Sequence, residues 1–450
     1  MRIGVVGTGY VGLVSGTCFA AFGTEVVCVD KDAGKIERLK QGIMPIYEPG
    51  LEELVEKQVA AGRLSFTTDL KEAVANVDAV FIAVGTPSRK TDGHADLTYV
   101  YEAAREIIAN VKGYVVLITK STVPVGTARE IESIVREMGR EKDIDVASNP
   151  EFLREGAAIE DFMRPDRVVV GTSSERATEV MRALYRPLFL NETPIVFTSP
   201  ETSEIIKYAA NAFLATKITF INEIANLCEA AGANVQHVAK AIGLDGRIGS
   251  KFLNAGPGYG GSCFPKDTLA LTQTGRKFGA PQRIVESVVE INADRQQQMA
   301  QKIVAACGGS VKGKKIGVLG IAFKPQTDDV RDAPSLVIIP ILQKLGATIA
   351  AHDPVAKEQA EKILESVTWE DDPYAVAVDA DALVIITEWN EYRQLDLKRI
   401  AASMKDKTLV DLRNIYKMSD IEPHGFRYVS IGRPDVAAGE GASTKIRAVK

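Results

Sequence analysis

A glycine pattern near the amino end constrains the fold more than any other feature of the chain. Apolar residues 2–6 are followed by Gly7-x-Gly9-x-x-Gly12, and a helical pattern begins at Tyr10. A second apolar run, residues 25–30, ends in Asp30, 18 residues after Gly12. Strand, glycine turn, helix and strand ending in an acid form a dinucleotide-binding unit, so we expect a doubly wound parallel sheet.

The ligand predicted from this pattern is NAD. The three glycines allow backbone N–H groups to approach a pyrophosphate at the helix amino end. Asp30 is expected to bind the ribose hydroxyls and to repel the additional phosphate of NADP. Lys35, five residues further, either reaches the same ribose or is an ordinary residue of a helix surface.

Polar residues follow the next apolar strands. The sequence predicts these strands over residues 78–87, 115–122 and 145–151. Ligands of open parallel sheets bind beyond the carboxyl ends of the strands. The residues expected there are Thr86, Thr122, Glu151 and Glu155.

A long helix is predicted over residues 200–231, from the Ser199-Pro200 start signal to Gly232. Apolar residues such as Phe213 and Ile221 recur in it at helical spacing. Lys207 and Asn211 are four residues apart and share a face. They are either site residues or part of an exposed polar stripe.

A glycine-rich stretch, residues 256–267, follows and leads into Cys263, Lys266 and Asp267. Four glycines and Pro257 predict a tight loop that a ligand can approach closely. A thiol beside a cation is a candidate nucleophile, and the carboxylate can handle protons. The alternative is a turn with a buried structural cysteine.

The last third of the chain repeats the first. Residues 314–322, 347–353, 381–387 and 408–412 match the four strands described above, but the first loop lacks GxGxxG. We therefore predict an α/β protein with two doubly wound Rossmann-like domains joined by a helical central domain with a long helix. The expected domains are 1–199, 200–308 and 309–433, with a flexible tail over 434–450 and a surface loop over 89–96.

Composition excludes several classes of protein. The net charge of −5 and the lack of a basic patch argue against nucleic-acid binding. Five widely spaced cysteines without a CxxC pair predict neither disulfides nor a metal site. The amino end is already a strand, so no signal peptide is expected, and no apolar run is long enough to cross a membrane. These features predict a cytoplasmic protein.

The motifs together resemble the UDP-glucose/GDP-mannose dehydrogenase family, specifically its UDP-glucose 6-dehydrogenase branch. The resemblance covers the chain to about residue 433. The motifs that carry it are Gly7–Gly12, Lys120-Ser-Thr-Val-Pro124, Asn149-Pro-Glu-Phe-Leu-Arg-Glu-Gly156, Lys207 with Asn211, Gly260-Gly-Ser-Cys-Phe-Pro-Lys-Asp267, and Phe323-Lys324 with Arg331.

The resemblance implies oxidation of UDP-glucose to UDP-glucuronate with two NAD, through a thiohemiacetal and a thioester on Cys263. It assigns Asp267 and Thr122 to the water or proton acceptor, Lys207 and Asn211 to oxyanion stabilisation, and Glu151 to acid–base steps. The residues themselves contain no HExxH motif and no Cys/His cluster, so no metal is expected. The resemblance also implies a homodimer, in which Arg247 reaches the substrate of the neighbouring subunit.

The ligand contacts implied by the resemblance form two sets. The cofactor set is Gly7, Gly9, Tyr10, Val11, Gly12, Asp30, Lys35, Thr86, Thr122, Glu155, Lys266 and Arg331. The substrate set is Glu151, Phe152, Leu153, Arg154, Glu155, Lys207, Asn211, Arg247, Phe252, Leu253, Asn254, Ala255, Gly256, Gly260 and Lys324.

Other functions remain open on the residues alone. GDP-mannose or a UDP-N-acetylhexosamine would use the same chemistry. A 3-hydroxyacid-type dehydrogenase also has a long helix with Lys and Asn four residues apart, but it has no need for Cys263. An NAD-binding redox sensor would not need Lys207, Asn211, Cys263 and Asp267 together.

Overall fold

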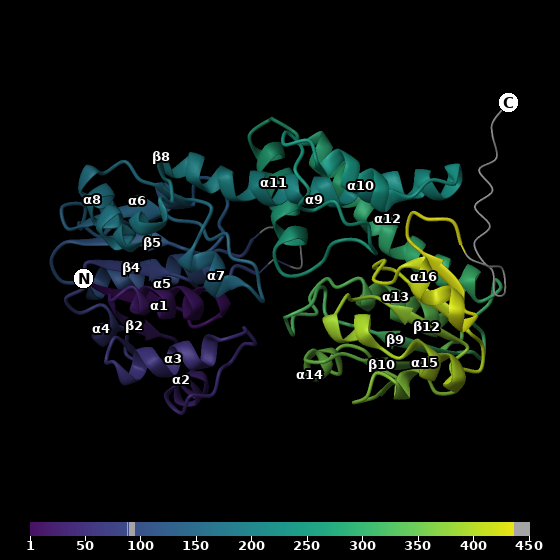
Figure 1. Ribbon diagram of the computed structural model, residues 1–450. Helices are drawn as coiled ribbons and strands as arrows, with labels where there is room; N and C mark the ends of the chain where they lie inside the picture. The colour runs from purple at the N-terminus through teal and green to yellow at the C-terminus, as the bar shows by residue number, and fades with distance from the viewer. Residues whose placement is uncertain (88, 90–94, 436–450) are drawn as a thin grey trace. The chain divides into compact units, whose positions relative to one another are not determined.

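The structure, a computed structural model, describes residues 1–87, 89 and 95–435. The expected tail over 434–450 and the expected loop over 89–96 therefore lie mostly outside the described residues. The described chain is an α/β protein with one eight-stranded sheet, one six-stranded sheet and a region of long helices (Figure 1). The predicted fold class is confirmed.

The first sheet contains the strands β1 (Arg2–Val6), β2 (Glu25–Val29), β3 (Leu64–Thr67), β4 (Ala79–Ile82), β5 (Val115–Thr119), β6 (Ile144–Ser148), β7 (Val168–Gly171) and β8 (Ile195–Thr198). Their order is β3-β2-β1-β4-β5-β6-β7-β8. Neighbouring strands are parallel except β6 and β7, which pair antiparallel between Ser148 and Gly171. The sequence reasoning did not assign β3, β7 or β8, each of which has only four residues.

Helices cover both faces of this sheet because its strands are apolar at successive positions. The helices are α1 (Tyr10–Ala21), α2 (Ala33–Lys40), α3 (Leu51–Ala60), α4 (Leu70–Ala73), α5 (Thr98–Asn110), α6 (Thr127–Glu137), α7 (Ala158–Met163), α8 (Glu175–Leu184) and the 3₁₀ helix η1 (Arg186–Asn191). In β4, Phe81 packs in one apolar cluster with α1 and α3, while Val80 packs in another with α5 and α6.

The long helical region consists of α9 (Pro200–Ala231), α10 (Val235–Gly243), α11 (Phe264–Lys277) and α12 (Arg283–Ala306). The bounds of α9 agree with the prediction at both ends. Gly232, which follows it, has a φ of +72°, a conformation that glycine adopts without strain. No helix among the described residues, α9 included, has the length and apolar character needed to cross a membrane.

The second sheet is parallel throughout, in the order β11-β10-β9-β12-β13-β14. Its part of the chain contains β9 (Lys315–Leu319), α13 (Ser335–Lys344), β10 (Thr348–His352), α14 (Lys357–Ala360), β11 (Val367–Trp369), η2 (Ala375–Ala377), β12 (Ala382–Ile385), η3 (Asn390–Gln394), α15 (Leu397–Ser403), β13 (Thr408–Asp411), α16 (Met418–Ile421), η4 (Glu422–His424) and β14 (Arg427–Ser430). The predicted repeat is confirmed, because this order matches the first six strands of the other sheet.

Contacts between residues divide the chain into two compact units. Unit 1 comprises Met1–Ala210 and Leu269–Pro281, and unit 2 comprises Asn211–Thr268 and the chain from Gln282 onward. The division falls inside α9 and inside α11. The predicted domain limits at 199, 308 and 433 stay predictions.

Candidate functional site

The glycine motif of unit 1 has the geometry of a nucleotide-binding turn. Gly7 has a φ of +100°, and a Cβ there would lie 2.6 Å from the carbonyl oxygen of Ala83. A Cβ on Gly12 would lie 1.9 Å from the oxygen of Gly7, so this glycine lets the helix pack against the turn. A Cβ on Gly9 would meet no atom within 4 Å, so a ligand can approach the backbone there. The three glycines thus meet the three requirements of a pyrophosphate site.

Asp30 follows β2 and faces this turn. Its Oδ2 accepts hydrogen bonds from the backbone N–H and the hydroxyl of Thr8, at 2.9 and 2.8 Å, and from Nζ of Lys35 at 3.0 Å. Partial burial raises the pKa of Asp30, but hydrogen bonds from Thr8, Asp32 and Lys35 outweigh it and lower the pKa to about 2. A fixed negative charge therefore stands where the ribose is expected.

The second sheet uses the corresponding acid differently. Asp353, after β10, accepts hydrogen bonds from the backbone N–H groups of Ile321 and Ala322 at 2.7 and 3.0 Å, and from the indole of Trp389 at 3.2 Å. The carboxylate is buried under these partners. This geometry agrees with the absence of GxGxxG from the loop after β9.

Two predicted cofactor residues meet at the ends of β4 and β5. The hydroxyl of Thr86 donates a hydrogen bond to the carbonyl oxygen of Thr122 over 3.1 Å. Both residues follow strands that are neighbours in the sheet. The prediction that they lie at one sheet edge is confirmed, although both strands end earlier than the sequence indicated.

Glu151 and Lys207 form a buried ion pair in unit 1. Nζ of Lys207 lies 3.2 Å from Oε1 of Glu151, and the two side chains are 4% and 6% exposed. The backbone N–H of Leu153 donates to Oε2 of Glu151 over 2.5 Å, and Nζ of Lys207 lies 5.4 Å from the ring centre of Phe152. The alternative that Lys207 and Asn211 form an exposed stripe is wrong, since both are buried.

A second buried lysine belongs to the same region. Nζ of Lys120 donates to Oδ1 of Asn149 at 3.0 Å and lies 3.2 Å from the hydroxyl of Tyr185. Burial lowers the pKa of Lys120 to about 8, Glu151 opposes this shift, and the positive charge of Lys207 adds to it. The sequence reasoning gave Lys120 no role, although it stands in the Lys120–Pro124 motif.

In unit 2, the predicted residues of α9 and α11 meet. The amide of Asn211 donates to Oδ2 of Asp267 over 2.6 Å, and Nζ of Lys266 lies 3.2 Å from Oδ1. Asp267 is fully buried. Cys263 directly precedes α11, and its carbonyl accepts the N–H of Asp267 at 2.8 Å. Cys263 is partly exposed while the other four cysteines are buried, so the buried-cysteine alternative is wrong.

Polar residues of α9 and α12 hold the glycine-rich loop. Asn292 accepts the N–H of Tyr259 at 2.9 Å and donates to its carbonyl at 3.1 Å. Arg295 donates to the carbonyl of Gly256 at 3.0 Å, and Asn222 accepts the N–H of Gly256 at 2.8 Å. The sequence reasoning missed these residues. Polar side chains at positions 292, 295 and 296 of an otherwise apolar helix face are the signal that would have indicated them.

The loop also packs closely on residues 323–332. A Cβ on Gly260 would lie 2.2 Å from the carbonyl oxygen of Asp332, and the N–H of Gly261 donates to the carbonyl of Arg331 at 2.8 Å. The side chain of Arg331 pairs with Asp329 at 2.7 Å. Lys324, in the same segment, places Nζ 5.3 Å from the ring centre of Phe323.

The remaining predicted substrate residues have varied surroundings. Phe252 has a φ of +66°, a strained value for a side chain of this size that is typical of functional loops. Leu253 and Ala255 are buried in the core of unit 2. Arg247 is 89% exposed and pairs with Asp245, and Arg154 pairs with Asp161.

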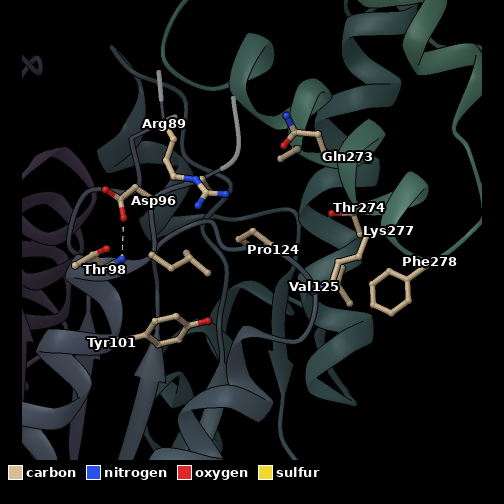
Figure 2. A pocket seen from close by; sticks show the side chains of 13 residues that line it. Arg89, Asp96, Thr98, Tyr101, Pro124, Val125, Gln273, Thr274, Lys277 and Phe278 are labelled. Atoms are coloured by element: carbon tan, nitrogen blue, oxygen red, sulfur yellow. Dashed lines mark hydrogen bonds between the residues drawn. The ribbon is translucent and has the colours of Figure 1, made fainter. Parts of the chain in front are cut away.

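Two pockets lie in unit 1. The first, of about 360 Å³, lies between the start of α5, Pro124 and Val125, and the end of α11 (Figure 2). Its lining mixes charged residues such as Arg89 and Lys277 with apolar ones such as Phe278. It contains none of the predicted site residues. The second, of about 530 Å³, is lined by Glu48 and Gly156 among others, and so borders the predicted substrate segment.

Comparison with known proteins gives consistent matches along the chain. The profile of the UDP-glucose/GDP-mannose dehydrogenase family matches as NAD binding domain over residues 1–189, central domain over 201–294 and UDP binding domain over 317–418.

Relatives and solved structures agree with these profiles. UDP-glucose 6-dehydrogenase of Rhizobium meliloti is 62% identical to this chain, and the match covers 97% of this chain and 100% of the relative. UDP-glucose 6-dehydrogenase TuaD of Bacillus subtilis is 50% identical, and the match covers 98% of this chain and 95% of the relative. A UDP-glucose dehydrogenase structure from Pyrobaculum islandicum has a TM-score of 0.86 and 41% identity, covering 93% of this chain and 95% of that one. UDP-D-ManNAc dehydrogenase from Pyrococcus horikoshii has a TM-score of 0.85 and 28% identity, covering 97% and 100%. With the family's three domains in order and a relative of this identity over almost the full length, the chain belongs to the UDP-glucose/GDP-mannose dehydrogenase family.

Proposed function

We propose that this protein oxidises UDP-glucose to UDP-glucuronate in two successive NAD-dependent steps. The relatives from Rhizobium meliloti and Bacillus subtilis are both named UDP-glucose 6-dehydrogenase, and the chain has the family's NAD binding and UDP binding domains. The observation that carries the proposal is the position of Cys263, the one partly exposed cysteine of the five, directly before α11 and one turn from the buried Asp267.

The first oxidation converts the sugar alcohol to an aldehyde. NAD, when bound, accepts the hydride that leaves the carbon in each oxidation. The hydroxyl must lose its proton at the same time, and Asp267 and Thr122 hold the water or group that accepts it. Lys207 and Asn211 donate to the oxygen as negative charge develops on it.

The second oxidation needs Cys263 because an aldehyde carbon must first become tetrahedral. Sγ of Cys263 bonds to the aldehyde carbon, and the oxygen takes a proton to give a thiohemiacetal. Loss of hydride and of the hydroxyl proton gives a thioester. Water then attacks with Glu151 in the acid–base role, the carbon–sulfur bond breaks, and the thiol and the carboxylate are released. One water is consumed for each sugar.

Residues 252–256, Gly260 and Lys324 are proposed to hold the UDP-sugar, together with Glu151 to Glu155. Lys324→Ala should weaken UDP-glucose binding and leave NAD affinity nearly unchanged, as measured by calorimetry. Lys312→Ala, an exposed lysine in the same unit, is the matched control. The assignment fails if Lys324→Ala weakens NAD binding instead.

The experiment that tests the proposed function measures NADH formed from a panel of nucleotide sugars. UDP-glucose should give two NADH for each sugar consumed, with the highest kcat/KM of the panel. GDP-mannose and the UDP-N-acetylhexosamines are the competing substrates. A higher kcat/KM for any of them would replace the proposed substrate while keeping the chemistry.

We further propose a homodimer formed through α9. Phe213, Phe220 and Leu227 recur every seven residues on this helix and are 65%, 51% and 62% exposed. Large exposed apolar side chains along one face of a helix are typical of a surface that a partner covers. Arg247, almost fully exposed, is proposed to reach the substrate of the partner.

The oligomeric state tests this proposal. Phe220→Glu places a charge in the centre of the stripe and should shift the protein to a monomer in light scattering. Glu223→Gln, an exposed change on the same helix, is the control. A monomeric wild-type protein would contradict the proposal.

A further inference from the structure

Glu48 contacts two segments that bind different ligands in the proposed reaction. It lies in the loop before α3, is only 6% exposed, and has no role in the function described above. Its Oε2 accepts hydrogen bonds from the hydroxyl of Tyr10 and from the backbone N–H of Gly156 at 2.6 Å. Its Oε1 accepts the N–H of Ala158 at 2.7 Å. One buried carboxylate thus receives three donors.

The first donor belongs to the nucleotide motif. Tyr10 is the first residue of α1 and stands between Gly9 and Gly12. Burial, followed by the hydrogen bond to Glu48, raises the pKa of Tyr10, so the hydroxyl keeps its proton and stays a donor. The ring packs against the core of unit 1, which leaves the hydroxyl as the polar link of α1 to Glu48.

The other two donors belong to the end of the predicted substrate segment. Gly156 follows Glu155 and has a φ of +78°, and Ala158 begins α7. The N–H groups of Gly156 and Ala158 point at one carboxylate, which fixes the direction of the chain as it leaves residues 151–155. A shift of this carboxylate would move the segment that carries the ion pair of Glu151.

We propose that Glu48 is a positioning residue that holds the cofactor-binding turn and the sugar-binding segment in one geometry. The inference rests on the proposed function, because it needs residues 151–155 to contact the sugar nucleotide. Hydrogen bonds to a buried charged group are stronger than neutral ones, so the three bonds to Glu48 can fix the positions of both segments. Glutamine keeps the shape but presents an N–H group to one of the backbone donors.

The test compares Glu48→Gln, Tyr10→Phe and the double variant with the wild-type protein. Glu48→Gln should raise KM for both NAD and UDP-glucose about tenfold or more, with a smaller change in kcat. Tyr10→Phe removes only the hydroxyl and should raise KM for NAD more than KM for UDP-glucose. In the double variant, KM for NAD should be no higher than in Glu48→Gln. Glu53→Gln is the matched control, because Glu53 is an exposed carboxylate that lines the pocket of about 530 Å³ together with Glu48.

Binding of NADH gives a second readout that does not depend on turnover. NADH and UDP-glucose do not react with each other, so NADH fluorescence reports its affinity with and without saturating UDP-glucose. Glu48→Gln should lower the factor by which UDP-glucose changes NADH affinity.

Several outcomes would overturn the inference. They are KM values within twofold of wild type in Glu48→Gln, an unchanged KM for NAD in Tyr10→Phe, or effects of the two changes that multiply. Tyr10→Phe decides the question if Glu48→Gln does not fold. A wild-type protein that does not oxidise UDP-glucose would refute the proposed function instead, and NADH binding would still test the link between Tyr10 and Glu48.

Discussion

The side-chain amide of Asn211 donates a hydrogen bond to Oδ2 of Asp267 over 2.6 Å, and the carboxylate that receives it is fully buried. The second oxygen of Asp267 pairs with Lys266 at 3.2 Å. A buried carboxylate depends on such partners, since water does not reach it. The bond therefore connects the long helix α9 to the first turn of α11, which directly follows Cys263 in the sequence.

Removal of this bond should lower the stability of the protein. Asn211→Ala should lower the free energy of unfolding by about 1–3 kcal/mol, because Asp267 loses a donor inside the protein. Asn211→Asp places a second carboxylate there, so one of the two must bind a proton. Its melting temperature should fall further below wild type at pH 8 than at pH 5. An equal decrease at both pH values would contradict the contact.

Asp30 should determine the choice between NAD and NADP. Its pKa of about 2 keeps the carboxylate charged at all pH values used in assays, so it repels a phosphate on the ribose. Asp30→Ala should lower the ratio of kcat/KM for NAD to that for NADP by about tenfold or more, because the repulsion of the NADP phosphate is lost. A tenfold change corresponds to about 1.4 kcal/mol. Lys35→Met is the control for loss of the neighbouring charge. An unchanged ratio in Asp30→Ala would remove Asp30 from the cofactor site.

The sequence was sufficient where the signals are local. Ser199-Pro200 and Gly232 predicted both ends of α9, and the repeated apolar runs predicted a second doubly wound sheet, which the structure contains. Local spacing did not indicate which face of α9 is covered. Phe213 is exposed while Lys207 is buried. The face of Lys207 is covered by a segment distant in the sequence, the one that contains its partner Glu151.

Residues whose partners are distant in the sequence could not be predicted. Glu48 stands 38 residues from Tyr10 and 108 from Gly156, so no short motif contains the three. Asn292 likewise contacts Tyr259, 33 residues earlier. Such contacts arise only when the chain folds, whereas the glycine motifs reflect the backbone conformation of a few consecutive residues.

Gly260 should tolerate no side chain. A Cβ there would lie 2.2 Å from the carbonyl oxygen of Asp332, a backbone atom that cannot move without shifting its segment. Gly260→Ala should therefore lower the melting temperature and reduce kcat at least tenfold, since displacement of a site by about 1 Å can cost about a hundredfold in rate. Gly246→Ala, with no atom within 4 Å of the added carbon, should leave both unchanged. Equal behaviour of the two variants would refute the close packing of the loop.

Lys120 should make stability depend on pH above neutrality. Burial lowers its pKa from 10.5 to about 8. The unfolded chain then binds more protons than the folded one between these values, so the contribution of Lys120 to stability is fully present above pH 10.5 and is lost as the pH falls to about 8. Lys120→Met removes the titration and keeps the volume. The melting temperature of wild type should rise relative to Lys120→Met between pH 8 and pH 10, and parallel curves would contradict the shifted pKa.

Cys263 should separate the two oxidations. If its thiolate captures the aldehyde, wild type forms two NADH for each sugar, while Cys263→Ala forms at most about one for each active site and stalls, because no thiohemiacetal forms. Cys263→Ser can form a hemiacetal, but its hydroxyl is a weaker nucleophile and its alkoxide a poorer leaving group, so a slowly hydrolysed ester should accumulate. Intact-mass measurement of Cys263→Ser after mixing with UDP-glucose and NAD should detect that adduct. Cys228→Ala, at a buried cysteine, should keep two NADH for each sugar. Free carboxylate and two NADH from Cys263→Ala at near wild-type rate would show that the thiol is structural and that another group oxidises the aldehyde.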